Sequence, residues 1–264
     1  MAAARLGARV GFVGTIGGDE IANVKRRSLV DNGVDISRCI EHDGPEDQVI
    51  LVAVHAGTGE RYFSGLDRSH RRVLDPAELD MDYILSADYL HVEGYHREAS
   101  LYAAKAMKAA GKTVVMDGST RSTPVPDETK ELVEQVDVLI CGSGFCPNLT
   151  GIHDDIYACG KAALDMGPRI VVQTEGADGS YTVTKDEQFH VPAFDIDVVD
   201  TTGAGDVFHG AYIVGLLHGW SLRQTAQFAT AVSAIKCTKL GGRVPIPTFA
   251  ATMAFLRERG IEIE

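Results

Sequence analysis

The segment Asp200 to Asp206, with the sequence DTTGAGD, combines a glycine-containing loop with two carboxylates. A strand-like pair of valines precedes the segment, and an apolar helical pattern follows it at once. Glycine lets the backbone turn tightly and approach a ligand closely. A helix N-terminus offers N–H groups without internal partners and a partial positive charge. The combination predicts a site for an anion such as phosphate.

Asp206 is the unexpected member of this segment, because bound phosphate repels a neighbouring carboxylate. Its position is chemically sensible if Asp206 takes a proton from a nucleophile that attacks the phosphate. The sequence therefore indicates phosphoryl transfer as the chemistry of this loop.

Two further segments carry polar groups at the ends of predicted strands. The segment HVEGYH offers His91, Glu93 and His96, for which a surface loop, a substrate contact and a zinc site are alternative interpretations. The segment TEGADGS begins at Thr174, and a structural turn and a nucleotide contact are both compatible with its residues. Two other glycine-containing segments, GFVGTIGGD and AGKT, lack the spacing of dinucleotide-binding and P-loop motifs.

The elements that must position these residues alternate between apolar strand-like runs and helical patterns. This rhythm predicts an α/β fold with a mostly parallel sheet covered by helices on both faces. The strand-like runs 179–183 and 188–194 follow each other closely, which suggests that they add antiparallel strands to this sheet. A β-rich stretch at about 40–65 interrupts the rhythm and predicts a small β flap, or lid. Three helices are expected to close the chain, starting near Asp206, Ser221 and Pro247.

Length and composition place these elements in one domain that spans residues 1–264. The chain has no apolar run long enough for a transmembrane helix, so no membrane partner is expected. A net charge of -12 argues against nucleic acid as a partner. The five cysteines are scattered, which favours reduced thiols and a cytoplasmic location.

Taken together, these motifs resemble those of the ribokinase-like, PfkB-type carbohydrate kinases. DTTGAGD followed by VFHGAYIVGL resembles the C-terminal signature of that family, and TEGADGS resembles its nucleotide segment. The segments ARLGARVGFVGTIGGDE and NGVD resemble its early glycine segment and the motif that follows it. The resemblance covers essentially the whole chain.

The resemblance implies an ATP-dependent kinase that uses Mg²⁺ and phosphorylates a sugar hydroxyl. It implies that Asp206 is the catalytic base and that an anion hole holds the phosphoryl group. In some members, the positions of Asp200 and Thr202 help to hold a monovalent cation such as K⁺. A homodimer is expected as well. The implied anion hole is Gly203, Ala204 and Gly205, and the implied ATP-binding residues are Thr174, Gly176 and Gly179.

Within the family, VDTTGAGDVFHGA and KCTKLGGR are most similar to the sulfofructose kinase branch. A sulfonate-bearing sugar would need polar ligands, and His96, Arg97 and Arg121 are the candidates. For each of these three residues the alternative is an ordinary solvated side chain.

Two departures from the family pattern matter. The N-x-x-E motif tied to magnesium is replaced by residues 142–145, so magnesium is expected to be held through water and the ATP phosphates. The first strand of the family, which carries a sugar-binding Asp, has no counterpart before Met1. We therefore expect a bared strand edge that promotes association, and weak sugar phosphorylation with ATP binding intact. The alternative function is a non-catalytic nucleotide-binding relative without a complete sugar site.

Overall fold

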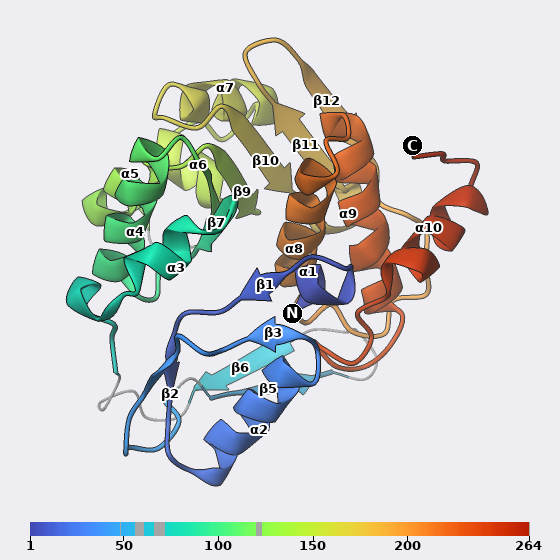
Figure 1. Cartoon of the computed structure of the whole chain (residues 1–264). Helices are drawn as coiled ribbons and strands as arrows, with labels where there is room; N and C mark the ends of the chain where they lie inside the picture. Colours follow the sequence, from blue (N-terminus) through green and yellow to red (C-terminus); the bar gives the residue numbers. More distant parts are fainter. Residues whose placement is uncertain (48, 56–60, 66–71, 120–122, 264) are drawn as a thin grey trace.

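The computed structural model describes residues 1–47, 49–55, 61–65, 72–119 and 123–263 (Figure 1). Its largest sheet has six strands in the order β12-β11-β10-β9-β8-β7. The four strands from β7 to β10 are parallel, and the other two join them antiparallel, as predicted. The strands are β7 (Tyr89–Val92), β8 (Thr113–Gly118), β9 (Val138–Gly142), β10 (Ile170–Thr174), β11 (Ser180–Val183) and β12 (Gln188–Val191).

Helices cover both faces of this sheet because its strands are apolar on both sides. In β9, Val138 and Ile140 face one core, while Leu139 and Cys141 face the other. The first core is shared with α1 (Ala2–Arg5), α8 (Ala204–Leu217), α9 (Leu222–Cys237) and α10 (Phe249–Arg257). The second is shared with α3 (Met81–Leu85), α4 (Arg97–Ala109), α5 (Asp127–Val133), α6 (Phe145–Thr150) and α7 (Ile156–Leu164).

Helix α8 is the first of the three predicted closing helices, and its central residues are buried. It is apolar around its circumference, as expected for a helix packed between a sheet and another helix. Helix α9 packs along it and begins with a capping box formed by Ser221 and Gln224. The two helices therefore give the DTTGAGD loop a rigid support.

A smaller unit is formed by the first part of the chain and lies beside the main sheet in Figure 1. It contains α2 (Glu20–Val30) and three two-stranded sheets. Two of these sheets are parallel, and the third is the predicted hairpin, whose turn lies outside the described residues. The predicted strand at 10–14 is instead two short strands, β1 and β2. The strands of this unit are β1 (Val10–Gly11), β2 (Thr15–Ile16), β3 (Val34–Asp35), β4 (Ile40–Glu41), β5 (Ile50–Val54) and β6 (Arg61–Gly65).

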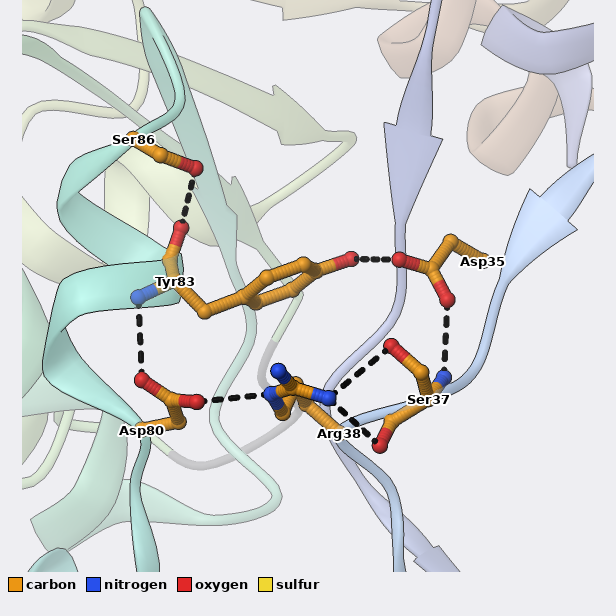
Figure 2. A network of polar contacts seen from close by, with 6 residues as sticks. All are labelled: Asp35, Ser37, Arg38, Asp80, Tyr83 and Ser86. Atoms are coloured by element: carbon orange, nitrogen blue, oxygen red, sulfur yellow. Dashed lines mark hydrogen bonds and ion pairs between the residues drawn. The ribbon is translucent and has the colours of Figure 1, made fainter.

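A polar network joins this smaller unit to α3 of the main body (Figure 2). The Tyr83 hydroxyl donates to Asp35 Oδ2 at 2.6 Å, and Arg38 Nε donates to Asp80 Oδ2 at 2.6 Å. Ser37 N also donates to Asp35 Oδ1 at 2.8 Å. Hydrogen bonds from Tyr83 and Ser37 and a favourable Coulomb interaction with Arg38 hold the pKa of Asp35 below its usual value. The network fixes where the flap-bearing unit meets α3.

Strand β7 forms one edge of the main sheet. It pairs with β8 and, within the part of the chain that the structure describes, with no other strand. The expected short helix and following strand at the start of the chain are α1 and β1, and β1 pairs with β3. No helix of the described residues is long and apolar enough to cross a membrane.

Candidate active site

The DTTGAGD loop lies at the carboxyl edge of the main sheet, where ligands of open α/β sheets bind. Its place is set by His209, one turn after Asp206 on α8. His209 Nδ1 lies 3.3 Å from His91 Nε2 on β7, and its Nε2 lies 3.8 Å from Asp117 Oδ1 on β8. These contacts hold the second turn of α8 against the C-terminal parts of the two strands.

The loop ends in a left-handed glycine that starts the helix. Gly203 has a φ of +73° and is the N-cap of α8, so the helix begins at Ala204. Asp206 lies in the first turn and is exposed. A Cβ atom built on Gly203 would lie 3.5 Å from Asp206 Oδ2, which places the carboxylate close to the loop. A Cβ atom at Gly205 would meet no atom within 4 Å, so the first turn of the helix is open on that side.

The first carboxylate of the motif, Asp200, ties two loops together. Its Oδ1 accepts from Thr202 N at 2.7 Å, and its Oδ2 accepts from Gly241 N at 2.8 Å. Burial alone would raise the pKa of Asp200, but hydrogen bonds from Thr202 and Gly241 and the nearby Lys236 ammonium lower it. The Thr202 hydroxyl is buried beside this carboxylate without full hydrogen-bond geometry. Asp200 is therefore a structural anion that shapes the loop.

The C-terminal half of α9 supports the same loop from behind. Ser233 Oγ donates to Ala204 O at 2.9 Å, and Lys236 Nζ donates to Asp200 O at 2.7 Å. The backbone N–H of Val199 donates to Cys237 O at 2.8 Å. Sequence reasoning missed these supports, although a lysine within the apolar run AVSAIKC was a usable signal, because a lysine is rarely buried without a partner.

The cluster of His91, Asp117 and His209 contains two perturbed histidines. Burial lowers the pKa of His209 to about 4, so its ring is neutral near pH 7. Desolvation and the neighbouring His209 shift the pKa of His91 in the same direction. The pKa of His91 is also about 4, so both imidazole rings are neutral near pH 7. Burial raises the pKa of Asp117. The cluster positions α8 through imidazole rings that are neutral near pH 7.

The predicted nucleotide segment lies at the carboxyl end of β10, on the same sheet edge. The Thr174 hydroxyl donates to Cys141 O at 3.2 Å, so it must turn away from this acceptor to contact a phosphate. Gly176 has a φ of +57°, and a Cβ atom there would meet no atom within 4 Å. A Cβ atom at Gly179 would lie 2.1 Å from Val191 O, so the fold itself requires glycine there. The structural-turn interpretation thus accounts for Gly179, while Thr174 and Gly176 stay candidates for ATP contact.

The predicted sugar ligands lie around the start of α4. His96 Nδ1 accepts a hydrogen bond from Leu74 N at 3.2 Å, and Arg97 forms an ion pair with Glu128 at 3.7 Å. Both partners of that ion pair are largely exposed, which makes the pair weak. Arg121 lies outside the described residues.

The segment that replaces the magnesium motif connects β9 to α6. Gly144, with a φ of +84°, is the N-cap of α6, and Ser143 Oγ donates to Thr174 O at 3.2 Å. Over the described ranges, no three His, Cys, Asp or Glu side chains gather in a way that could hold a metal ion. The segment thus braces the nucleotide loop, and the zinc interpretation of HVEGYH has no supporting cluster.

Comparisons with known proteins show the family to which this chain belongs. Residues 1–249 match the pfkB family carbohydrate kinase model. An ATP-dependent ribose-1-phosphate kinase of Halopiger xanaduensis is 30% identical, over 98% of this chain and 85% of its own length. A fructokinase-2 of Zea mays is 31% identical, over 94% of this chain and 80% of its own length.

A solved structure shows the same architecture. It is the aminoimidazole riboside kinase of Salmonella enterica in complex with aminoimidazole riboside and an ATP analog, with a TM-score of 0.76 and 25% identity. The similarity covers 97% of this chain and 88% of that one. The predicted ribokinase-like fold is therefore confirmed.

Proposed function

This chain belongs to the pfkB family of carbohydrate kinases and is a phosphotransferase that acts on a sugar hydroxyl, and we propose that Asp206 is its catalytic base. The observation that carries this proposal is the exposed carboxylate of Asp206 in the first turn of α8, next to a loop braced by Asp200. Phosphoryl transfer depends mainly on positioning and electrostatic stabilisation, which a braced helix N-terminus supplies.

In the proposed reaction, the Asp206 carboxylate takes the proton of the sugar hydroxyl. The hydroxyl oxygen then attacks the γ-phosphorus of ATP, and the bond to the bridging oxygen breaks to release ADP. The backbone N–H groups of Gly203, Ala204 and Gly205 are the proposed donors to the charge that develops on the transferring group. Ala204 N donates to Thr201 O at 3.1 Å, so this N–H would have to exchange that partner for the phosphate. Mg²⁺ that enters with ATP would supply further neutralisation of the phosphates while keeping several waters.

ATP is the proposed donor, with Thr174 and Gly176 as proposed contacts. Two features support this assignment: the segment shares the carboxyl sheet edge with α8, and the similar Salmonella enterica kinase was solved with an ATP analog. Gly179 shapes the same turn through its φ of +93°.

A sulfofructose-like sugar stays a prediction for the acceptor. The relatives act, by their names, on ribose 1-phosphate and fructose, so they do not narrow the choice to one sugar. The Arg97 guanidinium supports an anionic sugar tail, because its exposed ion pair with Glu128 is weak enough to be exchanged.

The test measures ADP release with a panel of ribose, fructose, ribose 1-phosphate and sulfofructose. We expect Asp206→Asn to keep ATP binding and reduce turnover by about 10²-fold or more. Asp186→Asn, which changes an exposed carboxylate in the β11–β12 turn, is the matched control and should keep full turnover. An Asp206→Asn enzyme with wild-type turnover would remove Asp206 as the base. ATP binding without ADP release for any sugar would instead favour the non-catalytic alternative.

A further inference from the structure

The resemblance implies a monovalent cation beside Asp200 and Thr202, and the structure offers a direct test of that expectation. A cation at this position would need to balance the buried Asp200 carboxylate, whose residue is only 2% exposed. A buried carboxylate requires a compensating positive charge or several hydrogen bonds. The question is therefore which positive charge the protein places there.

Lys236 already places a positive charge behind the loop. The residue is 0% exposed, and its Nζ donates to Asp200 O at 2.7 Å. The ammonium also acts electrostatically on the Asp200 carboxylate. A buried ammonium is costly unless it is hydrogen-bonded or paired, and here the hydrogen bond to the Asp200 carbonyl oxygen and the nearby carboxylate offset that cost.

The position of Lys236 on its helix favours the same role. Lys236 lies in the last turn of α9, where the helix dipole stabilises a cation. The turn that follows supplies Gly241 N to Asp200, so the lysine, the carboxylate and both loops form one unit. One ammonium and one carboxylate balance each other, and a free metal ion would add an unbalanced charge to a buried site.

We propose that the Lys236 ammonium is a built-in monovalent cation that replaces a free potassium ion behind the anion loop. The proposal deepens the proposed kinase function by assigning Lys236 as a positioning residue for the Asp200–Asp206 loop. It takes the place of the expectation that this chain binds K⁺ through Asp200 and Thr202. A tethered ammonium and a potassium ion carry the same charge, so one can substitute for the other.

The first test uses the wild-type protein. Thermal unfolding and ADP release are measured in potassium, sodium and choline chloride at one ionic strength of about 0.1 M. We expect the melting temperature to be the same in the three salts and turnover to differ by less than about twofold, because no free ion is bound to the native state. Specific stabilisation or activation of the wild-type protein by K⁺ would overturn the proposal.

The second test opens the site with Lys236→Ala. This variant leaves Asp200 and the buried Thr202 hydroxyl as oxygen ligands for an added ion. We expect a lower melting temperature and a loss of turnover of about tenfold or more. Potassium or ammonium chloride should restore part of both, whereas choline chloride should not. Lys239→Ala, at an exposed lysine three residues later, is the control and should behave as wild type in every salt.

The melting temperatures test the role of Lys236 independently of the proposed kinase function. If no sugar is phosphorylated, the kinase proposal fails, but the salt dependence of unfolding still tests Lys236. If the Lys236→Ala protein folds and no added cation stabilises it, the proposal that Lys236 replaces a free cation is wrong. If the variant does not fold, the wild-type measurements decide the outcome alone.

Discussion

Gly203 and Gly205 are two positions apart, and the structure gives them different reasons to be glycine. Gly203 adopts a φ of +73°, and a Cβ atom there would lie 3.3 Å from Gly242 O. An L-residue at this φ costs roughly 1–2 kcal/mol. Gly205 has an ordinary helical backbone, and its Cβ direction is open. The fold therefore requires the first glycine, while only a ligand would require the second.

This difference leads to a prediction at the scale of the residue. Gly205→Val should keep the melting temperature of the wild type but reduce phosphoryl transfer by about 10²-fold, because its side chain fills the space in which the phosphate is proposed to lie. Gly203→Val should lower both stability and turnover. Thermal unfolding and ADP release on the two variants are the measurements. If Gly205→Val retains both turnover and ATP affinity, the loop is only a turn.

Helix α8 is positioned by a side-chain contact as well as by apolar packing. His209 is 4% exposed and bridges toward β7 and β8 through His91 and Asp117. In the unfolded chain a histidine has a pKa near 6.5, whereas burial lowers that of His209 to about 4. Between these values the unfolded state binds more protons, so stability is fully present above pH 6.5 and is lost as the pH falls toward 4.

At the scale of the element, we therefore predict that acid weakens the contact of α8 with β7 and β8 and lowers the free energy of unfolding. Between pH 6.5 and 5, His209 should account for about 2 kcal/mol of lost stability. His209→Gln cannot take up this proton, so its free energy of unfolding should vary less over the same range. Urea unfolding of both proteins at several pH values measures the difference. The raised pKa of Asp117 acts in the opposite sense in both proteins. Parallel pH profiles would show that His209 is not the sensitive group.

At the scale of the whole molecule, the described part of the β5–β6 hairpin has a face with exposed large hydrophobic side chains. In the β5–β6 hairpin, Leu51 and Ala53 pair with Ser64 and Tyr62, so these four side chains share a face. Leu51 is 60% exposed and Tyr62 is 63% exposed. An isolated two-stranded hairpin is marginally stable in water, and a covered face would stabilise it.

The expected homodimer can be tested at this face. Leu51→Lys places a charge on it and should shift the protein toward a monomer in light scattering coupled to gel filtration over a concentration series. Val24→Lys, at a 55% exposed valine of α2, is the matched control and should leave the mass unchanged. A wild-type protein that is monomeric throughout the series would contradict the prediction. Association that persists in Leu51→Lys would move the interface elsewhere, with the edge of β7 as the next candidate.

The sequence by itself determined the features that depend on neighbouring residues. The apolar runs at 138–142 and 170–174 specify buried parallel strands, and Gly111 marks the stop of α4 through its φ of +69°. The DTTGAGD loop could be interpreted as an anion site because its glycines and helix start are adjacent in the chain. The sequence predicted a single strand at 10–14 where the structure has two short strands, because strands of two residues are too short to show a periodic pattern.

Only the tertiary structure decided which distant side chains meet. His209 and His91 are 118 positions apart, and Lys236 and Asp200 are 36 apart, so no local pattern encodes either contact. The same holds for Tyr83 and Asp35, which join α3 to the smaller unit. These contacts follow from how α8, α9 and α3 pack, and packing depends on the shape of whole surfaces. The chemistry of the loop could therefore be inferred from the sequence, while the contacts that hold it in place required the fold.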